Sequence, residues 1–116
     1  MGNVKIAKVI FRSGMIKSIK EKSSCEETIL TGDGISPEVQ KIFNLDKIAE
    51  LSGKWGDPAV GSPIQYQRAV VELADGTSCE IEVYNLAIMF FHSNDERIKR
   101  LFRFMARLER HVKSRE

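Results

Sequence analysis

The side chains with the most reactive chemistry in this chain are two cysteines and two histidines, Cys25, Cys79, His92 and His111. A nucleophilic site needs a thiol or hydroxyl within hydrogen-bond reach of a base such as an imidazole. Neither cysteine lies in a motif that marks a nucleophile, and Cys79 belongs to an alternating run that points it inward. We therefore predict no catalytic residue and favour a non-enzymatic protein. A small enzyme with a site near His92, which precedes the C-terminal helix, is the second alternative to this hypothesis.

The spacing of these residues predicts neither a metal site nor a disulfide. The two cysteines are far apart in the sequence and form no CxxC pair, and two histidines at positions 92 and 111 match no zinc-finger spacing. In a reducing compartment two isolated cysteines are more often small buried side chains than a bridge. We expect no metal, no cofactor and two free thiols.

Residues 53–63, GKWGDPAVGSP, form the segment richest in glycine and proline. Gly53-Lys54 is followed by Trp55 and not by serine or threonine, so a phosphate-binding loop of the GxxxxGK[ST] type is not indicated. Long connectors in compact domains are often functional, which makes this loop the first candidate for a binding site. Trp55 either fills the core or anchors an interface, and the sequence leaves both open.

A basic stripe is expected on the C-terminal helix. At 100° per residue, five cations fall opposite the apolar side of this helix: Lys99, Arg100, Arg103, Arg107 and Arg110. The guanidinium fork suits phosphate and carboxylate groups, so nucleic-acid binding is one interpretation. The other is a solvated face whose aliphatic stems cover apolar neighbours. We favour the solvated face, because no nucleic-acid-binding motif is present.

The elements that position these residues can be read from periodicity. Residues 4–11 and 15–20 are expected to form a hairpin that turns at Ser13-Gly14, with a third strand at 27–31 and a turn at 31–34. Ser36 then caps a helix that begins at Pro37, a short helical segment follows Asn44, and Gly53 ends it.

The stretch QYQRAVVELADGTSCEIEVY, residues 65–84, alternates strictly and predicts a second hairpin. A turn with Gly76 in the left-handed conformation sets its register. Three inward pairs follow from that register: Leu73 with Thr77, Val71 with Cys79, and Ala69 with Ile81. Two outward pairs follow as well: Arg68 with Glu82, and Tyr66 with Tyr84. We expect the two tyrosines to be exposed and available to a partner.

The C-terminal part begins with NLAIMFF, residues 85–91, a continuous apolar run that is either a buried strand or a turn of helix. Periodicity does not decide between them, and we favour the strand. Ser93 then caps the helix of residues 95–115. Ile98, Leu101, Met105, Leu108 and Val112 share one side of that helix, with Phe102 and Phe104 on its two shoulders. The apolar arc is broad, so it either packs within the chain or also contacts a second copy.

Composition places the chain among ordinary single-domain proteins. It has 116 residues with 42% hydrophobic and 29% charged residues, and one α+β domain over residues 1–116 is expected. The net charge is +2, with basic residues gathered toward both ends and acidic residues in the middle. These blocks either give one positive and one negative face or interleave in the fold. With no secretory pattern and no apolar run of membrane-spanning length, we expect a cytoplasmic protein without membrane contact.

The fold expected from these patterns is a mostly antiparallel sheet of five to six strands, a short helical segment in the middle, and a long amphipathic C-terminal helix packed on the sheet. The leading functional hypothesis is a protein–protein interaction module, a homodimer formed through the C-terminal helix and the 53–63 loop. Its interface candidates are Trp55, Tyr66, Tyr84, Phe102 and Phe104. The alternative is a nucleic-acid-binding domain that uses the basic stripe.

Overall fold

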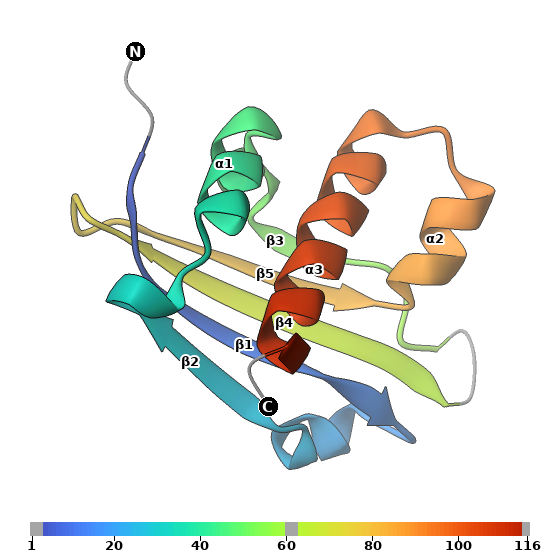
Figure 1. The fold of residues 1–116 in the computed structure, drawn as a ribbon. Coiled ribbons are helices and arrows are strands. Elements are labelled where there is room, and N and C mark those ends of the chain that lie inside the picture. The colour runs from blue at the N-terminus through green and yellow to red at the C-terminus, as the bar shows by residue number, and fades with distance from the viewer. Residues whose placement is uncertain (1–3, 60–62, 115–116) are drawn as a thin grey trace.

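The computed structural model describes residues 4–59 and 63–114. It has the predicted α+β fold, in which helices cover one face of a mostly antiparallel sheet (Figure 1). Within the described residues the sheet has five strands in the order β2-β1-β4-β5-β3. The strands are β1 (Ile6–Ile16), β2 (Glu27–Thr31), β3 (Gly53–Trp55), β4 (Ile64–Leu73) and β5 (Ser78–Tyr84). The helices are α1 (Pro37–Leu45), α2 (Leu86–His92) and α3 (Glu96–Ser114), with 3₁₀ helices η1 (Ile19–Ser24), η2 (Gly32–Gly34) and η3 (Ile48–Leu51).

The hairpin of β4 and β5 confirms the predicted register. Val71 pairs with Cys79, Arg68 with Glu82 and Tyr66 with Tyr84. Leu73 N–H donates to the Thr77 carbonyl at 2.8 Å, and Gly76 has φ 93°, the left-handed conformation that the turn requires. Side chains of alternate residues therefore face either the helices or the opposite side of the sheet, as the alternation predicts.

The first predicted hairpin is wrong. β1 continues through Ser13-Gly14 to Ile16 without a turn, and it pairs along its length with β4, so that Gly14 lies opposite Tyr66. Gly14 serves a packing role there, because a Cβ atom at this position would stand 3.0 Å from Cys25 Sγ. Pairing with the ten-residue strand β4 offers more ladder hydrogen bonds than a local turn, and residues 19–24 form η1 instead of a strand.

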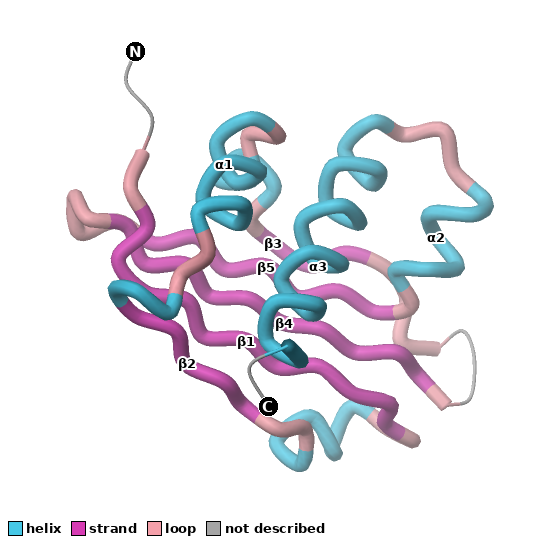
Figure 2. The backbone as a smooth tube through the Cα atoms, in the orientation of Figure 1, coloured by secondary structure: helices cyan, strands magenta, loops and turns pink. Residues whose placement is uncertain are grey.

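The helical layer consists of α1, α3 and α2 side by side over one face of the sheet (Figures 1 and 2). α1 begins as predicted, with Ser36 Oγ accepting a hydrogen bond from Glu38 N and with Pro37 at its first position. α3 presents its apolar side to the sheet, and five of its residues are buried: Leu101, Phe104, Met105, Leu108 and Val112. Phe104 packs against Phe43 of α1, with ring centroids 5.9 Å apart. The predicted docking of the C-terminal helix is thus confirmed.

Helix α2 corrects the expectation of a strand at residues 85–91. Asn85 has φ 56°, a left-handed conformation that asparagine tolerates, and this ends β5 and starts the helix. Asn85 is held there because its Oδ1 accepts from Gln65 N at 3.0 Å and its own N–H donates to Gln65 O at 2.8 Å. A buried strand would have hidden the whole apolar run, whereas the helix exposes part of it.

On the opposite face of the sheet, η1 lies over the ends of β4 and β5, where Lys22 covers Tyr66 and Tyr84. A small second core lies beneath it, formed by Ile16, Ile64, Tyr66 and Tyr84, with Cys25 packed against it.

Ion pairs join the basic ends of the chain to its acidic middle, such as Lys22 with Glu82 and Arg103 with Asp46. In these pairs, side chains of the basic blocks lie next to side chains of the acidic block, so the blocks interleave in the fold. None of the helices in the described part of the chain combines the length and apolar character that a membrane span requires.

Candidate interaction surface

The most exposed aromatic side chain described in the structure lies on α2. Phe91 is 78% exposed, and Ile88, one turn earlier, is 45% exposed. Phe90 turns toward α3 and stacks on Phe102, with ring centroids 4.1 Å apart and an angle of 18° between the rings. Phe91 meets the edge of Phe90 at 5.7 Å. We call Ile88, Phe90, Phe91 and Phe102 the α2 surface. Ile88 and Phe91 are its exposed members, and Phe90 and Phe102 are partly buried beside them.

Only Phe102 of these four was among the sequence-based candidates. The continuous apolar run NLAIMFF predicts a buried element and gives no reason to expect exposed members. The available signal was the spacing of Ile88 and Phe91, which share one side only if the segment is helical. Asn85, a residue that ends strands readily in the left-handed conformation, was the second signal.

Residues 53–55 of the expected 53–63 loop form strand β3, and Asp57 lies against the start of α2. Residues 60–62 of this loop lie outside the described part of the chain. Trp55 is half-buried: its indole N–H donates to the Leu51 carbonyl at 2.9 Å, and Arg97 stands over its ring at 5.3 Å. Asn85 Nδ2 donates to the Asp57 carbonyl at 3.2 Å. Trp55 therefore packs on the core while staying partly exposed, and its role as an interface anchor stays a prediction.

The other three interface candidates are buried in the chain's own cores. Phe104 is fully buried between α3, α1 and the sheet. Tyr66 and Tyr84 face each other as the register predicts, with ring centroids 5.7 Å apart, but the expectation that they are exposed is wrong. η1 covers them, because Lys22 Nζ lies above both rings at 5.8 and 5.3 Å.

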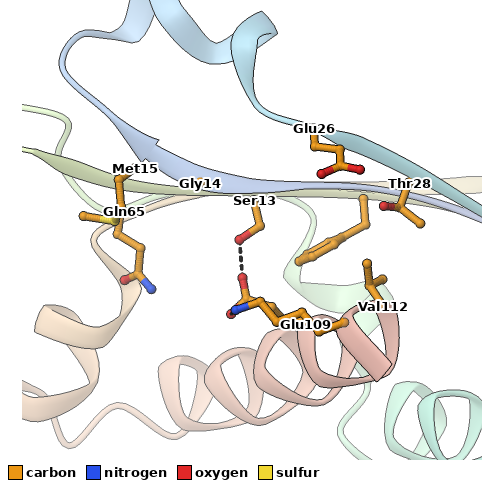
Figure 3. Close-up of a pocket in the computed structure, with 10 residues that line it drawn as sticks. Ser13, Gly14, Met15, Glu26, Thr28, Gln65, Glu109 and Val112 are labelled. Carbon is orange, nitrogen blue, oxygen red and sulfur yellow. Dashed lines mark hydrogen bonds and ion pairs between the residues drawn. The ribbon is translucent and has the colours of Figure 1, made fainter. Parts of the chain in front are cut away.

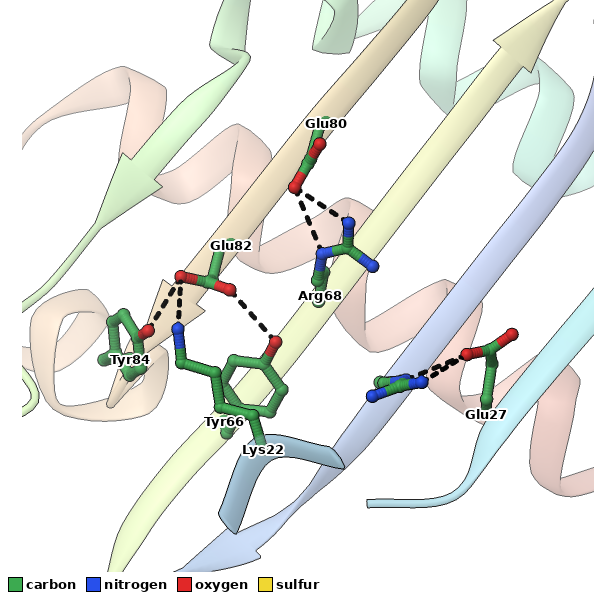
Figure 4. Close-up of polar contacts among 8 residues, drawn as sticks. Lys22, Glu27, Tyr66, Arg68, Glu80, Glu82 and Tyr84 are labelled. Atoms are coloured by element: carbon green, nitrogen blue, oxygen red, sulfur yellow. Dashed lines mark hydrogen bonds and ion pairs between the residues drawn. The ribbon is translucent and has the colours of Figure 1, made fainter. Parts of the chain in front are cut away.

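The polar cluster beneath η1 is centred on Glu82 (Figure 4). Its carboxylate accepts hydrogen bonds from Tyr66 Oη at 3.0 Å and Tyr84 Oη at 2.7 Å, and it forms an ion pair with Lys22 at 3.0 Å. Burial by itself would raise the pKa of Glu82, but the bonds from Tyr84, Lys22 and Tyr66 outweigh it and hold the pKa below its usual value. Burial and the bond to Glu82 raise the pKa of Tyr66. With both tyrosines protonated and Glu82 ionised, this cluster is a structural hydrogen-bond network and not a site for proton transfer.

Arg68 does not neutralise Glu82, contrary to the sequence-based interpretation. Its guanidinium binds Glu80 instead, with Nη2 at 2.9 Å from Oε1, although its Cα stands opposite Glu82 (Figure 4). The diagonal pair forms because Lys22, from a segment distant in sequence, already occupies the Glu82 carboxylate.

The basic stripe of α3 is largely paired with acidic groups of α1 and of the segment that follows it. Arg103 binds Asp46 with two hydrogen bonds of 2.7 and 2.9 Å, and Arg100 donates to the Asp46 carbonyl at 3.1 Å. Arg107 pairs with Glu38 at 2.9 Å. Lys99 and Arg110 are exposed, and their side chains have no hydrogen bond or ion pair with any residue that the structure describes. The stripe is thus part of the contact between α1 and α3 as well as a surface feature.

A groove of about 400 Å³ opens between the end of β1 and the C-terminal half of α3 (Figure 3). Ser13 Oγ donates to Glu109 Oε1 across it, and Glu26, Gln65 and Lys113 also line it. No histidine is among the residues that line this groove, so the Ser13 hydroxyl has no imidazole base beside it. We interpret its bond to Glu109 as a structural hydrogen bond between β1 and α3.

No family model, no curated protein and no solved structure matches this chain.

The residues considered for catalysis are not brought together. His92 is exposed and lines a pocket of about 310 Å³ with Asp57 and Ser93, and neither cysteine lines that pocket. Burial raises the pKa of both thiols, Cys25 and Cys79, which disfavours the reactive thiolate. In the described part of the chain no group of three or more His, Cys, Asp and Glu side chains is placed to hold a metal ion.

Proposed function

We propose that this chain is a non-enzymatic protein–protein interaction module that self-associates as a homodimer through the α2 surface. The observation that carries the proposal is the 78% exposure of Phe91 beside the exposed Ile88. Phenylalanine is among the residues that are enriched in protein interfaces relative to the rest of the surface. Leaving them in water has no structural benefit for the fold, whereas burying them against a partner is favourable by the hydrophobic effect.

A second copy is the partner that the composition of α2 favours. The segment Leu86–His92 contains no lysine, arginine, aspartate or glutamate, so two copies related by a twofold axis can approach without opposing like charges. Phe91 of each copy would then meet the α2 surface of the other. Phe102 from α3 is part of this contact, and Asp57 lies beside it at the start of α2. The dimer surface thereby keeps the two regions expected from the sequence and adds α2 between them.

The cytoplasm is the compartment that we propose for this function. Cys25 and Cys79 are both free, as expected of a protein kept in a reducing environment. An enzyme with a site near His92 has less support: neither cysteine lines its pocket, the Ser93 hydroxyl there accepts a hydrogen bond from Asp95 N, and among the described residues no metal ligand set accompanies this histidine.

The test is light scattering coupled to size-exclusion chromatography on the wild type and on Phe91→Asp at tens of micromolar. We expect a dimer for the wild type and a monomer for Phe91→Asp, because the substitution places a charge at the centre of the contact. Leu45→Asp is the matched control, since Leu45 is a comparably exposed apolar residue at the end of α1. A monomeric wild type, or a Phe91→Asp variant that stays dimeric, contradicts the proposal.

A further inference from the structure

A second surface beside α2 combines aromatic rings with a row of cations. A groove of about 370 Å³ runs along α3 and is lined by Phe90, Lys99, Phe102, Arg103, Ala106, Arg107 and Arg110. We call it the α3 groove. Its lining contains no acidic side chain, although Asp46 and Glu38 reach two of its arginines from the far side of the helix. A groove with this lining suits an anionic ligand.

The cations of the α3 groove recur about once per helical turn. Lys99, Arg103, Arg107 and Arg110 are three or four residues apart, which corresponds to roughly 4.5–6 Å along the helix axis. Lys99 and Arg110, at the two ends of the row, are exposed and have no described acidic partner. A row of this kind matches a ligand that carries one negative charge at regular intervals.

The two arginines between them remain accessible to a ligand. Arg103 uses Nε and Nη2 for Asp46 and still has 55% of its side chain exposed, so its remaining N–H groups point to solvent or the groove. The pair of Arg107 and Glu38 lies at the surface, where an ion pair contributes little and exchanges readily for a phosphate contact.

The apolar wall of the α3 groove is the stacked pair of Phe90 and Phe102. An acidic peptide has no flat group in each unit, so it would form no repeated stacking contact with the rings of Phe90 and Phe102. A single nucleic-acid strand carries a phosphate and a flat base in every unit, and bases pack on aromatic side chains without regard to sequence. The combination of periodic cations with aromatic rings therefore favours a nucleic-acid strand over an acidic protein segment.

We propose that the α3 groove binds single-stranded nucleic acid. Lys99, Arg103 and Arg110 contact successive phosphates, and one or more bases pack against Phe90 and Phe102. This binding goes beyond self-association, because its cations lie on α3 and not on α2. Phe90 and Phe102 belong to both surfaces, so strand binding and dimer formation compete for these rings.

The test is fluorescence anisotropy with a labelled oligothymidylate and a labelled oligouridylate, measured over a series of salt concentrations. We expect binding at low salt that weakens steeply with salt, by about 0.7 in log–log slope for each phosphate contacted. Lys99→Glu/Arg110→Glu should weaken binding at least about tenfold and reduce that slope. Lys41→Glu/Lys54→Glu makes the same change in net charge at exposed positions outside the groove and should retain most of the affinity.

A labelled poly-glutamate peptide distinguishes the ligand classes. If it binds as tightly as the oligonucleotides, the groove is a general polyanion surface or an acidic-protein site and the proposal is overturned. Absence of oligonucleotide binding at low salt, or equal binding by the two double variants, also overturns it. Light scattering on the same samples measures the oligomeric state separately from nucleic-acid binding. The groove variants keep Phe91 and Ile88, so a loss of binding without a change in oligomeric state is due to the groove.

Discussion

Lys22 Nζ lies 3.0 Å from Glu82 Oε1 and so joins η1 to β5 across 60 residues of sequence. This pair, with the hydroxyls of Tyr66 and Tyr84, holds η1 over one end of the sheet. Without it the second core would be open to solvent on one side. The ion pair is therefore the contact that gives the otherwise uncovered face of the sheet its local structure.

Replacing Lys22 by methionine should destabilise the protein by about 1–3 kcal/mol, because Glu82 would lose its cation while remaining buried. The cost stays below the roughly 3–5 kcal/mol of a fully buried pair, since Lys22 is partly exposed. Urea unfolding followed by tyrosine fluorescence measures the change. Lys20→Met, at an exposed position of the same η1, should change the unfolding free energy little. Equal urea midpoints for both variants would show that the Lys22–Glu82 pair does not contribute to stability.

The lowered pKa of Glu82 predicts a specific dependence of stability on pH. Its folded pKa lies below the unfolded value of about 4.3, so the ionised carboxylate contributes its full stability above that value. The contribution is lost as the pH falls through the folded pKa. Between about pH 5 and about pH 3 the unfolding free energy should therefore fall more steeply for the wild type than for Glu82→Gln. Glu80→Gln, at an exposed position on the same strand, is the comparison, and a wild-type slope no steeper than that of Glu82→Gln would contradict the assignment.

The sequence predicted the elements whose residues alternate or repeat strictly. The hairpin of β4 and β5 follows from its period of two and from Gly76, and both are local properties. The apolar side of α3 follows from its period of 3.6, and Leu101, Met105 and Leu108 are buried as expected. Patterns of this kind depend only on which side of one element faces the core.

The parts that the sequence did not predict depend on contacts between distant segments. The continuation of β1 past Gly14 is decided by its pairing with β4, which no local pattern reveals. The burial of Tyr66 and Tyr84 depends on η1 lying over them, and this in turn depends on Lys22 reaching Glu82. The helical state of α2, and hence the exposure of Phe91, depends on the bonds that Asn85 makes with Gln65.

Gly56 is predicted to be irreplaceable on steric grounds. It has φ 85°, and a Cβ atom there would collide with the carbonyl oxygen of Tyr84. Gly56→Ala should cost about 2–4 kcal/mol through left-handed strain and overpacking, and it should displace α2 from the sheet. Gly32→Ala is the matched control, because Gly32 also has a positive φ but nothing lies near its Cβ position. Thermal unfolding of the two variants would contradict this account if Gly56→Ala were the more stable.

Alanine substitutions of Phe104 and Phe91 should distinguish a residue that stabilises the fold from one that contributes to dimer formation. Phe104→Ala removes a fully buried ring from the main core and should lower the unfolding free energy by about 3–5 kcal/mol. Phe91→Ala should leave the unfolding free energy of the monomer nearly unchanged, because its ring is mostly in water. Dilution series monitored by light scattering, together with urea unfolding, measure both effects. A large loss of monomer stability in Phe91→Ala would mean that this ring belongs to the fold.

Asp46 limits the charge that the α3 groove presents, and neutralising it should strengthen nucleic-acid binding. Its carboxylate holds the Nε and Nη2 groups of Arg103, which asparagine would bind less strongly. Asp46→Asn should therefore tighten oligothymidylate binding several-fold at low salt while lowering the unfolding free energy by about 1 kcal/mol, since Arg103 is half-exposed. Glu72→Gln makes the same charge change beside Lys8 on the other face of the sheet and should leave binding nearly unchanged. Anisotropy titrations of the two variants decide the point: if Glu72→Gln tightens binding as much as Asp46→Asn, net charge alone governs it and Arg103 has no special place in the groove.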